Sequence, residues 1–130
     1  AWDVVRLGLG PVIASHANSR AVCAHTRNLS DDLFRAIRDS GGVVGLNLYT
    51  DFLGGADMDA VLRHIEHLLD LGGTETLALG GDLDGCDTLG GGVTGIQDYP
   101  KLYAALAAHG YDEPLLSALF SGNWLRVLPK

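Results

Sequence analysis

The sequence is poor in positive charge and has no long apolar run. Its 130 residues include 9 Lys and Arg against 16 Asp and Glu, which gives a formal net charge of −7 at pH 7. A nucleic-acid-binding protein needs a basic face, so this balance argues against a nucleic-acid partner. No apolar stretch approaches the roughly 20 residues that cross a bilayer, and no signal peptide is recognisable in a chain that begins at Ala1. The compartment therefore stays open.

Cysteine is also scarce. Cys23 and Cys86 are the only two, and they form no Cys-x-x-Cys pair, so no disulfide framework is indicated. The segment Cys23-Ala24-His25 could hint at zinc, but structural zinc sites usually bring four ligands at tight spacing. We expect both cysteines to act as small buried apolar residues.

The remaining composition is that of one globular domain, with 47% hydrophobic and 19% charged residues. Three apolar segments are typical of strands, at 11–14, 43–50 and 76–85. The first of them shows no alternation of apolar and polar residues. This pattern suits a strand that is covered on both faces.

Helical patterns separate and follow these strands. One helix begins at the N-cap candidate Ser30 and stops at Gly41. Apolar residues recur at helical spacing over 56–73. Two further helices start at the N-cap candidates Asp98 and Asp112, each with a proline in its first turn. The order βαβαβαα predicts an α/β fold with parallel strands joined by helical crossovers.

Polar and ionisable residues follow all three predicted strands. His16 comes after the first strand, Asn47 and Tyr49 end the second, and Asp82 and Asp84 end the third. In parallel α/β folds the ligand chemistry lies at the carboxyl ends of the strands, so we expect these groups to face the same rim.

Two further histidines, His64 and His67, could share one face of the helix predicted over 56–73. The apolar stripe of that helix packs on the sheet. We therefore expect the two to be hydrogen-bonded or solvated histidines rather than ligands.

Four motifs together resemble the membrane (renal) dipeptidase family of zinc peptidases. They are "PVIASHANSRAVCAHTRNLSDD", "GGVVGLNLY", "GGDLDG" and the closing "GNWLRVL", which occur in the family's order over nearly the whole chain. The resemblance implies a (β/α)8 TIM-type barrel that carries two zinc ions and hydrolyses dipeptides. What is present looks like the last three parallel βα units plus the C-terminal helices. Residues 1–130 would then be a single segment, the C-terminal part of that barrel domain.

The resemblance also implies roles for individual residues. His16 matches a strand-end zinc ligand, Arg27 matches the arginine that holds the substrate carboxylate, and Asp82 matches the acid beside the metal-bound water. Asn47 and Tyr49 fall near the pocket wall. The chemistry is coherent, because a guanidinium grips a carboxylate bidentately and zinc lowers the pKa of bound water to about 7. A nearby carboxylate can then carry that water's proton to the leaving amine.

The chain departs from the family in what it lacks. The His-x-Asp motif of the first barrel strand, the bridging glutamate and a second histidine are not in the sequence. Three strands cannot close a barrel, so we expect open sheet edges, self-association through them, and a chain that is inactive and binds zinc weakly by itself. The partners would be a dipeptide and the missing N-terminal part of the barrel. Two alternatives remain: a non-catalytic α/β module that binds a protein or small anion through Arg27, and a related metal-dependent amidohydrolase.

Overall fold

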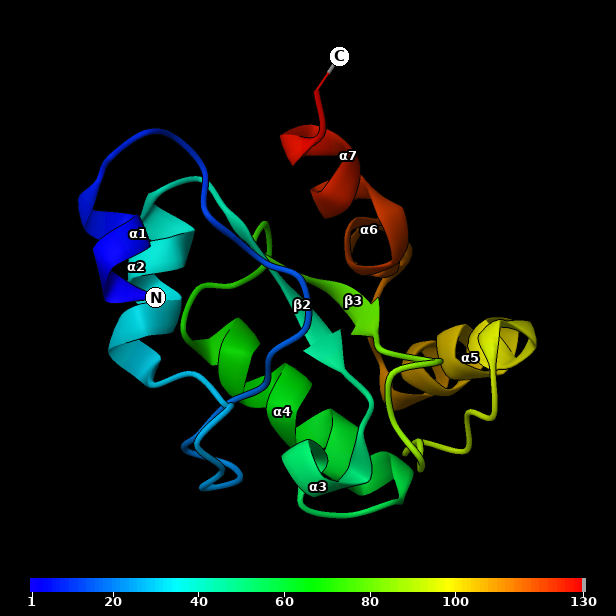
Figure 1. The fold of residues 1–130 in the computed structure, drawn as a ribbon. Helices are drawn as coiled ribbons and strands as arrows, with labels where there is room; N and C mark the ends of the chain where they lie inside the picture. The colour runs from blue at the N-terminus through cyan, green and yellow to red at the C-terminus, as the bar shows by residue number, and fades with distance from the viewer. Residues whose placement is uncertain (130) are drawn as a thin grey trace.

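The computed structural model describes residues 1–129 and contains a three-stranded parallel sheet with helices around it (Figure 1). The strands are β1 (Ile13–Ala14), β2 (Val43–Asn47) and β3 (Leu77–Gly81), in the order β1-β2-β3. Both neighbouring pairs run parallel. The predicted parallel α/β arrangement is therefore confirmed.

Helices connect the strands and complete the chain. α2 and α4 form the crossovers from β1 to β2 and from β2 to β3, as predicted. No helix within residues 1–129 is both long and apolar enough to cross a membrane. The helix bounds are α1 (Trp2–Arg6), α2 (Asp31–Asp39), α3 (Thr50–Leu53), α4 (Met58–Asp70), α5 (Tyr99–His109), α6 (Glu113–Ser117) and α7 (Asn123–Val127), with a 3-10 turn at Ile96–Asp98 and a π turn at Ala118–Gly122.

The core lies between the sheet and its crossover helices. Side chains from β2 and β3 pack against apolar residues of α2, α4 and α5, and all of these are nearly inaccessible to solvent. Burial of such side chains is the main stabilising term of a domain of this size. The largest of them are Phe34, Ile37, Leu46, Leu48, Leu53, Ile65, Leu68, Leu77, Leu102, Leu106, Leu116 and Leu119.

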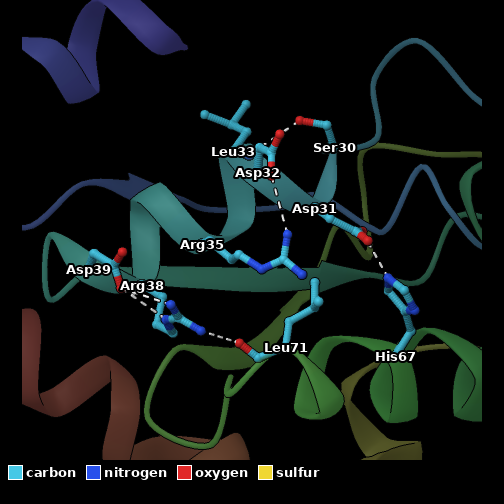
Figure 2. Close-up of polar contacts among 9 residues, drawn as sticks. All are labelled: Ser30, Asp31, Asp32, Leu33, Arg35, Arg38, Asp39, His67 and Leu71. Atoms are coloured by element: carbon cyan, nitrogen blue, oxygen red, sulfur yellow. Dashed lines mark hydrogen bonds and ion pairs between the residues drawn. The ribbon is translucent and has the colours of Figure 1, made fainter.

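The start and end of α2 follow the predicted signals. The Ser30 hydroxyl accepts a hydrogen bond from the Leu33 N–H at 3.2 Å, which satisfies a free donor in the first helical turn (Figure 2). At the other end Gly41 adopts φ +78°, the left-handed conformation that ends many helices.

Side chains tie α2 to α4 at both ends of α2 (Figure 2). The Asp31 carboxylate lies 2.8 Å from His67 Nε2 near the beginning of α2. Near its end, the Arg38 guanidinium donates to the carbonyl oxygen of Leu71, just beyond α4. The prediction that His67 is a hydrogen-bonded residue of the crossover helix is confirmed.

All three predicted strands are longer than the observed ones, and the first begins at Ile13 rather than at 11. The second ends at Asn47 rather than at 50, because the Asn47 side-chain oxygen accepts from the Tyr49 N–H at 2.7 Å and turns the chain into α3. The third ends at Gly81, where Gly81 and Asp82 take φ values of +63° and +58°. Left-handed residues cannot continue a strand.

The N-cap predictions differ in outcome. Asp112 caps α6, since its carboxylate accepts from the Leu115 N–H at 3.1 Å. Asp98 stands at the N-cap position of α5, but its carboxylate makes no capping bond there. It accepts instead from the N–H and the hydroxyl of Thr94, at 2.8 and 2.6 Å, so it closes the preceding loop.

The free edge of β3 is covered by α7. In a parallel ladder the backbone groups of alternate residues bond to the same neighbouring strand. The carbonyls of Leu77 and Leu79 therefore point away from β2. Asn123 Nδ2 donates to the Leu77 carbonyl at 2.7 Å, and Trp124 Nε1 donates to the Leu79 carbonyl at 2.9 Å. The prediction of open sheet edges is wrong at β3. At β1 the edge residue Ile13 is 45% exposed.

We predict that Asn123→Ala lowers the free energy of unfolding by about 1–3 kcal/mol, because it leaves buried carbonyls without a donor. Asn123 is buried and donates to Thr74 as well as to Leu77. Leu125→Ala, on the same helix but 64% exposed, should stay within about 0.5 kcal/mol of the parent. Urea unfolding of both variants measures the difference, and equal losses would contradict the edge-covering role.

Candidate functional site

The three strand ends bring polar residues to one edge of the sheet. His16 lies two residues after β1, Asn47 is the last residue of β2, and Asp82 directly follows β3. Since the strands are parallel, their carboxyl ends meet at the same edge, with β2 in the middle of the sheet; Figure 1 shows β2 and β3 side by side. The sequence-based placement of these residues at a common edge therefore agrees with the topology.

Asn47 connects the loops at this edge. Its side-chain Nδ2 donates to Asp82 Oδ2 at 3.2 Å. Its backbone is held by Asn18, whose Oδ1 accepts from the Asn47 N–H and whose Nδ2 donates to the Asn47 carbonyl, both at 2.8 Å. Asn18 and Asn47 are fully buried. The loop after β1 is thus joined to the end of β2, and β2 is joined to Asp82.

Asp82 has an unusual backbone conformation. Its φ of +58° makes it the one non-glycine residue with positive φ within residues 1–129. Asp and Asn tolerate this conformation better than other non-glycine residues, and such outliers occur often at functional sites. A Cβ at Gly85 would overlap Oδ1 of Asp82, so the glycine leaves room for the carboxylate.

Cys86 follows in the same loop, and its thiol donates to the Asp82 carbonyl at 3.2 Å. Burial raises the pKa of Cys86, and the carboxylates of Asp82 and Asp87 add to the shift. The group therefore stays a thiol at neutral pH. Both Cys23 and Cys86 are free, but they are only half-buried and their thiols donate to backbone carbonyls, so the expectation of small buried apolar residues is not met.

His16 is exposed, and its Nδ1 lies 2.8 Å from the Ser15 hydroxyl. This contact leaves Nε2 for another partner. Within residues 1–129 no three His, Cys, Asp or Glu side chains gather into a group that could hold a metal. Because zinc sites take three or four protein ligands, these residues by themselves do not fit a complete zinc site.

Arg27 lies among aromatic side chains. Its guanidinium carbon is 5.9 Å from the centroid of the Phe52 ring, and its backbone N–H donates to His25 Nδ1 at 3.1 Å. The Phe52 ring also contacts those of His25 and Tyr49, with centroids 4.6 and 5.0 Å away. A stacked guanidinium keeps its N–H edge free for a carboxylate. The neighbouring Asp51 carboxylate raises the pKa of Tyr49, so the phenol stays protonated.

Sequence reasoning assigned no role to several residues that organise the site. Asn18 holds Asn47, Phe52 underlies Arg27, and Asn28 donates to the carbonyls of Cys23 and Phe52, both at 2.9 Å. Nothing in their spacing distinguishes them from exposed loop residues. Phe52 is the exception. It is an aromatic residue five positions after Asn47, the polar end of a predicted strand, and this position could have marked it as part of the site.

Comparison with known proteins identifies the family. The family model of the membrane dipeptidases, peptidase family M19, matches residues 1–130. The chain belongs to this family. The resemblance drawn from the sequence motifs is confirmed, and so is the expectation of an α/β fold that forms part of a barrel.

Individual proteins are also similar to this chain. An uncharacterised protein from the pqqA 5′ region of Klebsiella pneumoniae is 42% identical over 98% of this chain, and Dipeptidase 3 of Mus musculus is 33% identical over 96%. A metallopeptidase from Rhodobacter sphaeroides, solved with a phosphinate mimic of the dipeptide L-Ala-D-Ala, is 43% identical over 94% of this chain, with a TM-score of 0.88.

The chain spans half or less of each of these relatives. It covers 49% of the Klebsiella protein, 26% of the mouse protein and 36% of the Rhodobacter protein. The roles assigned to His16, Arg27, Asn47, Tyr49 and Asp82 therefore stay predictions.

We predict that Gly85→Ala displaces the Asp82 carboxylate and breaks its bond to Asn47. The free energy of unfolding should fall by about 1 kcal/mol, the usual contribution of one hydrogen bond. Gly122→Ala is the matched control, because Gly122 has helical dihedral angles and the nearest atom to an added Cβ is 3.5 Å away. The control should be neutral or stabilising. Urea unfolding and the NMR shift of the Asn47 side-chain amide measure both effects.

Proposed function

We propose that this chain provides the last three βα units of a zinc-dependent dipeptidase. One observation carries the proposal: a metallopeptidase solved with a dipeptide mimic is 43% identical over 94% of this chain, with a TM-score of 0.88. The residues to which the family resemblance gives roles in this chain lie at the carboxyl edge of the sheet or in the loops beside it.

Arg27 would bind the free carboxylate of the dipeptide. A planar guanidinium presents two parallel N–H groups to a carboxylate, which a lysine cannot do. The Phe52 ring beneath the guanidinium restricts its orientation, and the His25 ring fixes the backbone at the same point. Tyr49, packed against Phe52, would form part of the pocket wall.

Asp82 would move a proton during hydrolysis. Its Oδ2 accepts from Asn47, and this bond orients the carboxylate at the strand end. In that position the carboxylate would take a proton from the attacking water and return it to the nitrogen of the leaving amine. Asn47 would hold the acid without reacting.

His16 would contribute one ligand to the zinc ions, which number two by the family resemblance. Its Nε2 is free of contacts to the Ser15 hydroxyl, which lies on the Nδ1 side of the ring. The other ligands would have to come from outside residues 1–129, because no further cluster of metal-binding side chains occurs among them.

We predict distinct kinetic effects for two substitutions in the complete protein, with the remaining barrel strands present. Arg27→Lys should raise KM for dipeptides by about 10–100-fold, the loss expected for a charged bidentate contact. Asp82→Asn should lower kcat by about 10²–10⁴-fold with little change in KM, since it removes a proton carrier. Steady-state assays on a series of dipeptides measure both.

Two exposed residues give matched controls for these variants. Arg35→Lys changes an arginine whose guanidinium pairs with Asp32 on α2, and Asp59→Asn changes an exposed acid in the first turn of α4. Neither should alter KM or kcat by more than about twofold, which is within the range of ordinary surface changes. Exchanged effects at positions 27 and 82, or equal effects in the controls, would count against the assigned roles.

The 130-residue chain alone should bind zinc weakly and hydrolyse no dipeptide, because one histidine and a nearby acid do not make a zinc site. Isothermal titration with zinc and a dipeptide assay test this. Addition of the N-terminal part of a homologous dipeptidase should restore turnover. Turnover by the chain alone would show a complete site within it, and failure of every complementation would favour a non-catalytic module.

A further inference from the structure

A buried histidine links the loop after β1, which carries Arg27, to α3, which carries Phe52. His64 lies on α4 and is fully buried. Its Nδ1 accepts a hydrogen bond from the backbone N–H of Ser19 at 3.1 Å, and its Nε2 lies 2.9 Å from the carbonyl oxygen of Leu53. Ser19 belongs to the loop after β1, and Leu53 is the last residue of α3.

These two backbone partners determine the protonation state of the ring. An N–H can only donate, so Nδ1 facing Ser19 must be without a proton. A carbonyl oxygen can only accept, so Nε2 facing Leu53 must carry one. Both bonds form together only when His64 is neutral and its proton is on Nε2.

The Ser19 loop is the segment that carries the candidate residues His16 and Arg27. It reaches the sheet through Asn18 and reaches α3 through Asn28 and through the contact of Arg27 with Phe52. Two buried atoms of the same loop, Ser19 Oγ and Asn28 Oδ1, have no hydrogen-bond partner within residues 1–129. The loop has several backbone bonds within itself and to β2, whereas the bond from Ser19 to His64 is the hydrogen bond that joins it to α4 within residues 1–129.

A proton on Nδ1 would place two donors face to face across 3.1 Å. The charged groups that act on the ring are Arg63 and His67, both on α4, and each opposes a positive charge there. Within residues 1–129 the hydrogen-bond partners of the ring are the Ser19 N–H from the loop and the Leu53 carbonyl from α3. Burial, the largest cause, lowers the pKa of His64 below its usual value of 6.5.

We propose that His64 is a positioning residue that, as a neutral imidazole, holds the loop of His16 and Arg27 against α3 and releases this loop when the ring is protonated. The effect of this loop on substrate binding rests on the proposed dipeptidase function, whereas the pH-dependent bond between His64 and Ser19 is a property of the 130-residue chain itself. An open loop would leave Arg27 without its fixed place over Phe52. Substrate binding would then weaken in acid although no substrate-contacting group had titrated.

The direction of the pH effect follows from linkage. The closed arrangement excludes the proton, while an open loop lets the ring titrate near 6.5. The closed state is therefore fully favoured above pH 6.5. The ratio of closed to open states should fall about tenfold for each pH unit below that value, until the lower pKa of the closed state is reached.

NMR of the ¹⁵N-labelled 130-residue chain tests the proposal without substrate or metal. At pH 7.5 the long-range ¹H–¹⁵N spectrum should show His64 with its proton on Nε2. Between pH 6.5 and 5 the hydrogen-exchange protection factor of the Ser19 amide should fall by about tenfold per pH unit, together with the titration of His64. The other tautomer, or protection that is independent of the ring, would overturn the proposal.

Two variants test the bonds of His64 to Ser19 and to Leu53 separately. His64→Asn places an amide oxygen near the position of Nδ1 and should keep the Ser19 amide protected at every pH. His64→Gln extends its amide toward Leu53, so it should lose at least about tenfold of that protection at pH 7.5. His109→Asn, which removes a histidine paired with Glu66 and not among the groups that act on the His64 ring, is the control and should retain the parent pH dependence. Equal behaviour of the Asn and Gln variants would also overturn the proposal.

If a variant does not fold, the titration of the parent chain decides alone. Failure of these measurements leaves the dipeptidase proposal standing, because none of them involves turnover. An inactive reconstituted enzyme, in turn, would leave the role of His64 in the loop unchanged.

Discussion

The loops that follow the three strands are held together through Asn47, the buried last residue of β2. Its backbone N–H and carbonyl both pair with the Asn18 side chain, and its own side chain bonds to Asp82 and to the Tyr49 N–H. A buried polar group without a partner is costly, so each of these bonds constrains the residue on its other side. The position of the acid after β3 and the course of the loop after β1 both depend on this one residue.

The regular elements were predictable because their signals are local. Ser30 caps α2, Gly41 ends it, and the apolar period over 56–73 gives α4. The family motifs identified the barrel fragment. The ends of the strands were less accessible, because an Asx turn at Asn47 and left-handed residues at 81 and 82 stop the strands inside apolar sequence. These turns are local, but the Asn47 side chain that forms one of them is also held by its bond to the distant Asp82, which no local pattern reports.

In the candidate site, too, some residues could be predicted from the sequence and others could not. The positions of His16, Asn47 and Asp82 after strands follow from the fold class, and Arg27 came from the family motif. The residues that support them, Asn18, Phe52 and His64, could not be assigned, because their partners are distant backbone groups or rings. The sheet edge was predicted wrongly at β3 for a related reason. Amide and indole donors of α7 replace a neighbouring strand, and this use of Asn123 and Trp124 is not visible in a helical period.

The covering of β3 by α7 has a consequence for synthesis on the ribosome. β3 ends at Gly81, whereas the donors that cover its edge begin at Asn123. At typical rates of translation, the chain between them takes about 2–8 s to make. During that interval the outward carbonyls of Leu77 and Leu79 lack their donors, and an unpaired strand edge is a template for another chain. Crowded polysomes or slow codons in this stretch would prolong the exposure, so nascent chains arrested before α7 should be the species that chaperones capture.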